Sequence, residues 1–305
     1  MTKEEMDVLT DLFLAARRNI HASKLEFDEN GIPYSVPVDK DLYTRITNYL
    51  LQCGPTMLYR YRPGNSRDID SIRQDTIWLS TLKEYNDPFE IRAYIDFEGV
   101  VDSFLRMDPK TVEHMRLHHI DKNHPLYKKC INDIKARGQK LQDELSMKQL
   151  RVFTACFCEN KSSLLMWAHY ANAHKGFCIG YNFKDIVGKF GTNIVPVIYS
   201  QDYSVIRSYE TFVDYDEFFL NAWRSKSEEW SYEKEWRLAG EYRINEPYQK
   251  GQVTSMIKPS CIYMGVNIDA AVKHQLIEIC KEREIKLYQM HLSEKSYRLL
   301  AYCVL

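Results

Sequence analysis

The sequence predicts a mixed α+β fold, and three observations lead to this class. Segments that alternate apolar and polar residues, as strands do, recur along the chain. Segments of helical periodicity lie between them without the strict alternation of a β-α-β fold. The motif GxGxxG, the Walker loop and the motif GxSxG are absent from the sequence, so the common nucleotide-binding and hydrolase folds are not indicated.

The N-terminal part of the chain is predicted to be helical. Thr2 and Glu5 have the spacing of a capping box, and an apolar stripe at helical spacing follows them, made of Met6, Leu9, Leu12, Phe13 and Ala16. A second helix is predicted over about 41–53, where Gly54-Pro55 ends the helical pattern. We therefore expect an N-terminal helical segment, 1–54, ahead of an α+β core domain, 55–305.

The core domain is predicted to begin with a strand. Residues 57–62 alternate as a strand does, and Pro63-Gly64-Asn65 is turn sequence. The charged helical sequence from about 100 to 148 predicts a helical insertion. Further helices are expected over 68–74, 163–173, 215–227 and 269–284, and further strands over 76–80, 152–158, 177–183, 194–199, 235–242, 261–266, 285–291 and 297–304.

Composition excludes several classes of protein. The 305 residues carry 41 Lys and Arg against 42 Asp and Glu, a formal charge of −1 that argues against broad adhesion to nucleic acid or anionic membrane. No run reaches about 18 apolar residues, so no spanning helix is expected. The acidic start is unlike a secretory signal, and the eight cysteines form no CxxC pair. We therefore expect a cytoplasmic protein with reduced thiols.

The segment 230–238 is the most informative. If it enters a strand, Glu233, Glu235 and Arg237 share one face, while Trp236 and Leu238 mark the core-facing side. Two carboxylates at this spacing can divide labour, one stabilising a developing positive charge and the other positioning a nucleophile. The alternative is a solvated strand face with an internal Glu–Arg pair.

A second segment, 78–90, contains turn sequence. Asn86 and Asp87 hydrogen-bond locally to backbone in such turns, and Pro88 restricts the residue before it. The segment is therefore either a plain structural turn or the rim of a cleft. In a rim, Asn86, Asp87 and Glu90 would be able to bind ribose hydroxyls.

A third segment, 156–176, combines cysteines with aromatic residues. Cys156 and Cys158 face one way on a strand, but zinc needs four ligands and no second close cysteine pair exists. The helix that follows spaces Trp167 and Tyr170 as a packed face would, and it leaves His169 and Tyr170 as possible ligand contacts. The histidines at 114 and 118 lack the glutamate order of HExxH and are expected on a solvated helix face.

These segments together resemble a bacterial family catalogued as domain of unknown function 2971. The resemblance extends from about 57 to 265 and leaves the first 50 residues outside it. It is carried by Leu58-Tyr59-Arg60-Tyr61, Ile77-Trp78-Leu79-Ser80, Tyr85-Asn86-Asp87-Pro88-Phe89-Glu90, Met166-Trp167-Ala168-His169-Tyr170, His174-Lys175-Gly176-Phe177-Cys178-Ile179-Gly180-Tyr181 and Tyr232-Glu233-Lys234-Glu235-Trp236-Arg237.

The order of elements is also similar to the ADP-ribosyltransferase fold, which has a mixed, largely antiparallel split-sheet core. In that fold an opening strand carries an Arg or His that holds NAD, a second strand carries a Ser or Tyr motif, and a later strand is entered through a glutamate, often as ExE. Arg60, Cys158 and the pair Glu233 and Glu235 take these places. Cys158 stands where the family has Ser, and a thiol is a weaker hydrogen-bond donor than a hydroxyl, so Ser80 is a second candidate for this role.

The resemblance implies an enzyme that consumes NAD, an ADP-ribosyltransferase or NAD glycohydrolase acting in phage defence or as a toxin, without a metal. Glu235 would stabilise the cation that forms when the nicotinamide–ribose bond breaks, and Glu233 would orient or deprotonate the acceptor. Arg60 would pair with the phosphates. Tyr61, Trp78 or Tyr170 would stack on nicotinamide or adenine. Contacts to NAD or a related nucleotide are expected at Arg60, Tyr61, Ser80, Asn86, Asp87, Glu90, Cys158, Trp167, His169 and Tyr170.

Two other functions stay open at this point. A non-catalytic binding or sensor module would use the same cleft for a nucleotide or a protein. A metal-dependent hydrolase would use Asp87, Glu90, Glu233 and Glu235 as ligands. The acceptor is also open (protein, nucleic acid, small molecule or water), and the segment 1–54 is a candidate for regulation or for docking a protein partner.

Overall fold

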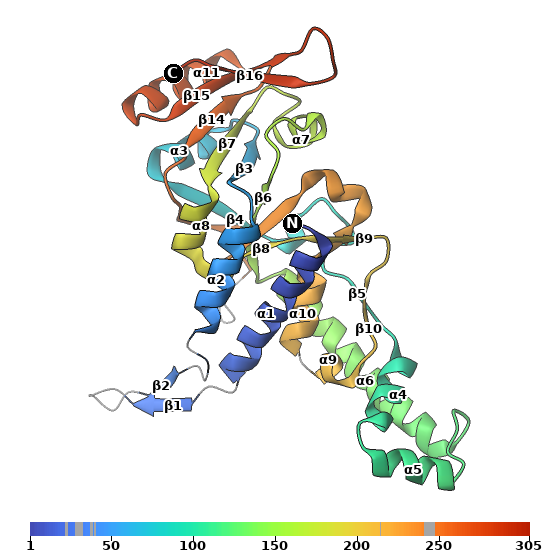
Figure 1. Cartoon of the computed structure of the whole chain (residues 1–305). Coiled ribbons are helices and arrows are strands. Elements are labelled where there is room, and N and C mark those ends of the chain that lie inside the picture. Colours follow the sequence, from blue (N-terminus) through green and yellow to red (C-terminus); the bar gives the residue numbers. More distant parts are fainter. Residues whose placement is uncertain (22–23, 28–32, 37–38, 40, 214, 241–247) are drawn as a thin grey trace.

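The computed structural model describes residues 1–21, 24–27, 33–36, 39, 41–213, 215–240 and 248–305. It has the mixed α+β architecture that the sequence predicts (Figure 1). Its main sheet contains both antiparallel and parallel pairs, and β14 and β15 are joined by a helix in a parallel pair. The strands of this sheet are β3 (Met57–Arg62), β4 (Thr76–Thr81), β6 (Phe153–Cys158), β7 (Phe177–Asn182), β8 (Ile194–Pro196), β12 (Glu235–Ala239), β13 (Gly251–Ser255), β14 (Cys261–Met264), β15 (Lys286–Leu292) and β16 (Leu299–Cys303).

Shorter strand pairs and helices complete the described part of the chain. Three two-stranded sheets are formed by β1 (Lys24–Phe27) with β2 (Pro33–Val36), β5 (Ala93–Ile95) with β10 (Ser204–Ile206), and β9 (Ile198–Ser200) with β11 (Ser225–Ser227). The helices are α1 (Lys3–His21), α2 (Leu42–Cys53), α3 (Ser66–Gln74), α4 (Phe97–Arg106), α5 (Pro109–Leu117), α6 (Pro125–Gln149), α7 (Leu164–Tyr170), α8 (Phe183–Phe190), α9 (Tyr209–Val213), α10 (Tyr215–Arg224) and α11 (Ala270–Glu282), with 3-10 turns η1 (Leu82–Glu84), η2 (Gly191–Asn193) and η3 (Glu228–Glu233).

The main sheet divides at β6. One edge of β6 pairs antiparallel with β12 over its length, from Glu235 opposite Cys158 to Ala239 opposite Thr154. The other edge pairs with β4 at the start of β6 and with β3 only at its end, where Tyr59 lies opposite Cys158. Because β3 and β4 both leave this edge, the sheet opens between them. We call this opening the split.

The two faces of the sheet around β6 differ in character. Phe157 and Trp236 lie in the main hydrophobic core, and their rings are buried. Cys156, Cys158 and Glu235 face the opposite side, as the alternation of the two strands requires. The sequence therefore predicted correctly which side of each strand carries polar chemistry.

The N-terminal helices pack into the same core as the sheet. The predicted capping box is present, since the Thr2 backbone N–H donates to a Glu5 carboxylate oxygen at 2.7 Å and the Glu5 N–H donates to Thr2 Oγ1 at 3.2 Å. Leu9 and Phe13 of α1 and Ile46 of α2 are buried in that core. The packing joins the helices closely to the strands, and the proposed boundary near residue 54 stays a prediction.

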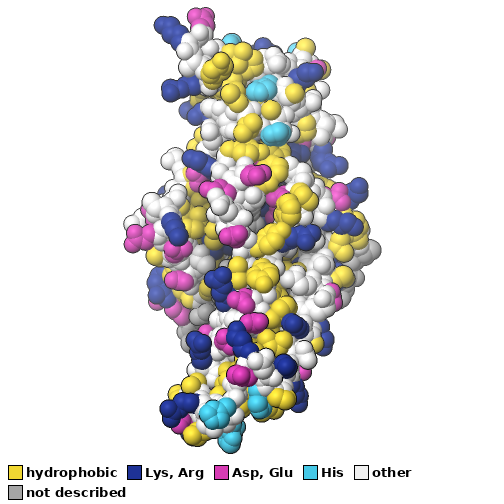
Figure 2. All heavy atoms as spheres, turned by 90° about the vertical axis from the view of Figure 1, so that its right-hand side faces the viewer, with side chains coloured by type: hydrophobic (Ala, Val, Ile, Leu, Met, Phe, Trp, Pro, Cys, Tyr) yellow, Lys and Arg dark blue, Asp and Glu magenta, His cyan; other side chains and the backbone are white. Residues whose placement is uncertain are grey.

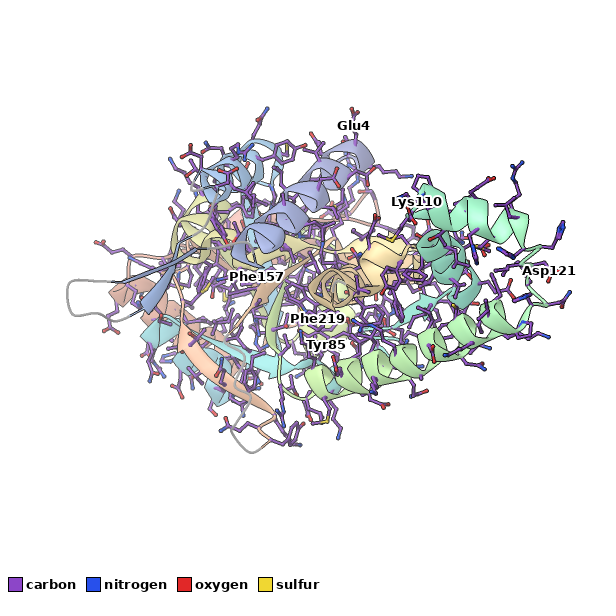
Figure 3. The ribbon with its side chains drawn as sticks, turned by 90° about the horizontal axis from the view of Figure 1, so that it is seen from below. Glu4, Tyr85, Lys110, Asp121, Phe157 and Phe219 are labelled. Atoms are coloured by element: carbon purple, nitrogen blue, oxygen red, sulfur yellow. The ribbon has the colours of Figure 1, made fainter. Side chains whose placement is uncertain are left out.

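Helices α4, α5 and α6 occupy residues 97–149, where the sequence predicts a helical insertion. In Figure 3 Lys110 and Asp121 lie at the periphery of this part, whereas Tyr85, Phe157 and Phe219 lie inside the molecule. Histidine side chains gather over its end (lower part of Figure 2), and the rings of His114 and His118 are 4.2 Å apart. Across the described residues, no group of three or more His, Cys, Asp or Glu side chains is placed to hold a metal ion. Within those same residues, no helix combines the length and apolarity needed to span a bilayer.

Several predicted elements differ from the structure. The helix expected over 163–173 ends at Tyr170, and residues 172–174 take left-handed conformations. The strand expected over 194–199 is two strands, because its two halves pair with different partners: β8 pairs antiparallel with β12, and β9 pairs in parallel with β11. The Val197 N–H still donates to Glu235 O, in register with the β8–β12 pair, and β9 begins at the next residue. The helix expected over 215–227 ends at Arg224, and 225–227 form β11, which pairs in parallel with β9. The strand expected over 235–242 is β12, which ends at Ala239, and positions 241 and 242 lie outside the described residues.

Candidate functional site

A cavity of about 390 Å³ lies over the polar face of β6, and we call it the main cavity. Its walls come from segments far apart in sequence, namely β3, β4, residues 84–86, β6, α7, β11, η3 and the start of β12. The split leaves room for it, since β3 and β4 diverge there. It is lined by Tyr59, Arg60, Tyr61, Arg62, Ser80, Glu84, Tyr85, Asn86, Thr154, Cys156, Phe157, Cys158, Met166, His169, Tyr170, Lys226, Glu233 and Glu235.

Glu233 and Glu235, which we call the acid pair, are held by one ammonium group. Lys226 Nζ lies 2.5 Å from Glu233 Oε2 and 2.8 Å from Glu235 Oε2. All three side chains are about 5% exposed or less. The chain reaches this arrangement through η3, after which Lys234 takes a left-handed conformation (φ 44°) and turns Glu235 into β12. The alternative of a solvated strand face is therefore wrong.

Arg237 is the second cation beside the acid pair. Its Nε donates to Glu235 Oε1 at 2.8 Å, which is the internal Glu–Arg pair that the spacing predicted. Its Nη1 donates to Glu90 Oε1 at 2.5 Å and also to the Trp223 carbonyl. Because Arg237 is completely buried, this pairing ties the loop that carries Glu90 to β12.

The two carboxylates of the acid pair have pKa values shifted in opposite directions. Burial would raise the pKa of Glu235, but Arg237 and Lys226 outweigh it and lower the pKa to about 2. Burial raises the pKa of Glu233 above 4.5, because Lys226 compensates it only in part. One carboxylate therefore stays ionised, while its neighbour binds a proton more readily than a free glutamate. Unequal carboxylates of this kind are typical of sites that perform acid–base chemistry.

Helix α7 supplies the side of the main cavity that faces Glu233. Ser163 caps this helix by accepting from the Met166 N–H, and the last turn carries His169 and Tyr170. Tyr170 Oη donates to Glu233 Oε1 at 2.6 Å and accepts from Asn86 Nδ2 at 3.3 Å. Asn86, Tyr170 and Glu233 thus form a chain of hydrogen bonds from the rim to the acid pair.

Arg60 crosses the split. Its Nη2 donates to the Trp78 carbonyl at 2.7 Å, which connects β3 to β4, two strands that each pair with β6. Its Nη1 is buried and has no hydrogen-bond partner among the described residues. Burial and the neighbouring Arg62 lower the pKa of Arg60 to about 10, so the group remains charged at neutral pH.

Two thiols lie on the floor of the main cavity. Cys156 Sγ is 3.0 Å from Tyr85 Oη, and Cys158 Sγ donates to the Asn160 carbonyl at 3.3 Å. Burial raises the pKa of Cys158 to about 12 and raises that of Cys156 as well. Both are therefore neutral thiols at physiological pH, and neither is an activated nucleophile.

The main cavity brings together most of the residues singled out from the sequence, but not all of them. Asp87 is buried and accepts from the Phe89 N–H at 2.8 Å, as the turn interpretation predicts. Glu90 lies behind Arg237 and does not line the main cavity. Trp167 is fully buried beneath it, its ring edge-on to Tyr61 at 5.1 Å and its Nε1 donating to the Lys161 carbonyl.

Sequence reasoning missed Lys226, which holds the acid pair. The residue falls in a stretch that the periodicity assigns to a helix, and no motif marks it. Tyr199 was missed as well, although its Oη accepts from the Glu235 N–H at 2.8 Å. Lys226 lies on β11 and Tyr199 lies on β9, and the parallel pairing of these two strands places both residues beside β12. No sequence pattern in strands of three residues carries that information.

Comparison with known proteins supports the family resemblance. Residues 166–238 match the family model described as Protein of unknown function (DUF2971). This segment runs from α7 to β12, so it contains Tyr170, Lys226 and the acid pair but not Arg60 or Cys158. It is shorter than the 57–265 over which the motifs resemble the family. Searches of curated proteins and of solved structures found no match.

Proposed function

We propose that this protein cleaves the nicotinamide–ribose bond of NAD, as an ADP-ribosyltransferase or an NAD glycohydrolase. The observation that carries the proposal is the convergence of Arg60, Cys158 and the acid pair on one cavity at a split in the sheet. These residues stand in the order that the ADP-ribosyltransferase fold requires, and they come from three different strands or strand ends. The unequal pKa values of the acid pair add support, because the two carboxylates have different tasks in this reaction.

The reaction assigns one task to each carboxylate. When the bond between the ribose anomeric carbon and the nicotinamide nitrogen breaks, its electron pair leaves with neutral nicotinamide and positive charge develops on the ribose. Ionised Glu235 stabilises that charge. The acceptor hydroxyl or water then forms the new bond to the anomeric carbon and gives its proton to Glu233, whose raised pKa suits a general base. Tyr170 orients Glu233 through its hydrogen bond.

A non-catalytic nucleotide-binding module is the second candidate, and one observation favours it. Both oxygens of Glu235 are already engaged, Oε1 by Arg237 and Oε2 by Lys226. A carboxylate held in this way is also suited to fixing the shape of a binding pocket. The metal-dependent hydrolase has less support, because Lys226 and Arg237 supply the cations that neutralise these carboxylates and Glu90 faces Arg237.

The test is nicotinamide release from NAD by the purified full chain, followed by chromatography. We expect wild type to release nicotinamide and Glu235→Gln to release it about 10²–10³ times more slowly. Glu229→Gln is the matched control, because Glu229 is an exposed residue of η3, and it should behave as wild type. Circular dichroism melting of each variant shows whether the fold is retained.

Three outcomes separate the candidates. Release by Glu235→Gln at the wild-type rate contradicts the proposed role of Glu235. A rise in melting temperature with NAD, without release by wild type, overturns bond cleavage in favour of the binding module. Release that stops on chelation and returns with Mg²⁺ supports the hydrolase instead.

A further inference from the structure

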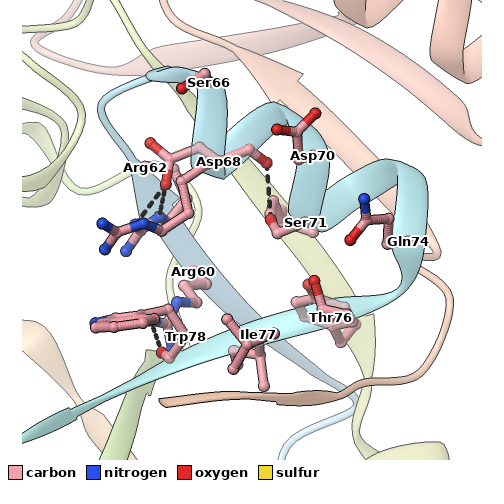
Figure 4. Close-up of a pocket in the computed structure, with 14 residues that line it drawn as sticks. Arg60, Arg62, Ser66, Asp68, Asp70, Ser71, Gln74, Thr76, Ile77 and Trp78 are labelled. Atoms are coloured by element: carbon pink, nitrogen blue, oxygen red, sulfur yellow. Dashed lines mark hydrogen bonds and ion pairs between the residues drawn. The ribbon is translucent and has the colours of Figure 1, made fainter. Parts of the chain in front are cut away.

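A second cavity, of about 280 Å³, opens on the other side of Arg60, and we call it the arginine pocket (Figure 4). It lies between α3 and the strands β3 and β4, and polar side chains of α3 face the strands across it. Arg60 and Arg62 line both this pocket and the main cavity. The two cavities are therefore neighbours that meet at the split.

The charges around the arginine pocket do not balance locally. Its two carboxylates are already paired, Asp68 with Arg62 (Nε to Oδ1, 2.6 Å) and Asp70 with Arg73 (3.3 Å). No ion pair joins either of the other two guanidinium groups, Arg60 and Arg67, to a carboxylate within the described parts of the chain. Positive charge is thus left over where the pocket meets the split, which favours an anionic ligand.

Arg60 supplies an independent sign of a missing partner. A buried guanidinium N–H without a hydrogen bond is rare and costs about 1–3 kcal/mol or more. Its Nη1 is such a group in the described structure. A phosphate oxygen at the split would satisfy it, and a guanidinium is well suited to that contact.

The opposite wall of the arginine pocket is aromatic. The Arg67 guanidinium lies over the Trp78 ring, 4.3 Å from its centroid. An indole face beside a guanidinium plane is a common stacking surface for nucleic-acid bases. Ser66, Gln74 and Thr76 add hydroxyl and amide groups to the lining of the pocket.

We propose that the arginine pocket binds the adenosine diphosphate half of NAD, with the diphosphate between Arg60 and Arg67 and the adenine against Trp78. The inference rests on the proposed function, since it assumes that the main cavity takes the nicotinamide half. The shared lining at Arg60 and Arg62 gives the dinucleotide a route from one cavity to the other.

Titration calorimetry with ADP tests this assignment without any bond cleavage. We expect ADP to bind wild type and to bind Arg67→Ala about 10–100-fold more weakly, the effect of losing one charged hydrogen bond. Lys273→Ala is the control: it removes an exposed cation of α11 that does not line the pocket, and it should bind ADP as wild type does. Both residues are exposed, so neither variant threatens the fold.

A titration with pyrophosphate, which lacks the base, distinguishes the contribution of the diphosphate to binding from that of the adenine. Trp78→Leu should weaken ADP about tenfold, as the loss of one base–aromatic stack does, and should leave pyrophosphate binding unchanged. If Trp78→Leu leaves ADP binding unchanged, the adenine assignment is wrong. If ADP does not bind wild type, or binds Arg67→Ala equally well, the whole inference is overturned.

The two proposals fail separately. ADP binding that depends on Arg67, without nicotinamide release from NAD, rejects bond cleavage and supports the arginine pocket as a site for adenosine diphosphate. Nicotinamide release with ADP binding that does not depend on Arg67 rejects the pocket and supports bond cleavage.

Discussion

Replacing Lys226 by Met is the most informative perturbation of this structure. The side chain is 5% exposed, and its ammonium lies within 2.8 Å of both carboxylates of the acid pair. Methionine keeps much of the volume and removes the charge. Among the described residues, Arg237 is then the cation paired with Glu90 and Glu235, and Glu233 loses its ammonium partner. Removing one member of a buried ion pair costs about 3–5 kcal/mol of unfolding free energy, and we expect a loss in this range at pH 8.

The loss should depend on pH, with a sign that the structure fixes. Without the ammonium, burial raises the pKa of Glu233 further above its unfolded value of 4.5. A group whose pKa is higher in the folded state is protonated in both states at low pH, and stability falls as pH rises through the folded pKa. The difference between wild type and Lys226→Met should therefore be smaller near pH 4.5, where the lost contact to ionised Glu235 remains, and it should grow toward pH 8 by about 1.4 kcal/mol per unit of additional pKa shift of Glu233.

Urea unfolding at pH 5 and pH 8, followed by tryptophan fluorescence, measures both effects. Lys273→Met is the matched control, because Lys273 is exposed on α11, and it should change the unfolding free energy by less than about 0.5 kcal/mol. A loss for Lys226→Met below about 1 kcal/mol and equal at both pH values is the behaviour of an exposed ion pair. That result would refute the description of the acid pair as a buried cluster held by Lys226.

Three further predictions concern stability. Leu9→Ala should lower the unfolding free energy by about 2–5 kcal/mol in urea titrations, because Leu9 is fully buried in the common core, and an unchanged midpoint would show that α1 does not pack there. Gly176→Ala should cost about 1–3 kcal/mol by thermal melting, since a Cβ there would overlap the Arg62 carbonyl, and Gly188→Ala, which meets no atom within 4 Å, is its control. Glu235 has a folded pKa of about 2 against 4.5 unfolded, so its contribution of about 3 kcal/mol to the unfolding free energy is complete above pH 4.5 and is lost as pH falls toward 2. The unfolding free energy of Glu235→Gln should therefore fall less than that of wild type on acidification. Parallel curves of unfolding free energy against pH for the two proteins would contradict this.

Much of the sheet could be predicted from the sequence, because long strands in this chain alternate clearly. The strand expected over 57–62 is β3, and the expected facing of Cys156, Cys158 and Glu235 is the observed one. Here a period of two determines which side chains share a face, and it needs no tertiary information. The capping box at Thr2 and Glu5 was predictable for the same reason, since its interactions are local.

The electrostatics of the site were not predictable from the same sequence. An exposed strand face and a buried acid pair are equally compatible with the residues at 233, 235 and 237. The two possibilities differ only in which side chains pack over the carboxylates. In the structure Lys226 packs against Glu233, although it lies seven residues earlier in the chain. Lys226 belongs to β11, a strand of three residues that pairs with β9. Local propensity has little influence on so short a strand, and tertiary packing decides its conformation.

The split in the sheet explains why chemistry gathers at this place. Residues 155–157 of β6 pair along one edge with β12, but neither β3 nor β4 reaches their other edge. Peptide groups on an unpaired edge inside a sheet need partners, and side chains or a ligand must supply them. Arg60 closes part of the opening by bonding to the Trp78 carbonyl, and it leaves Nη1 unpaired between the two cavities. The same departure from regular pairing therefore creates the space and leaves positive charge beside it, and both features favour the anionic ligand that we propose.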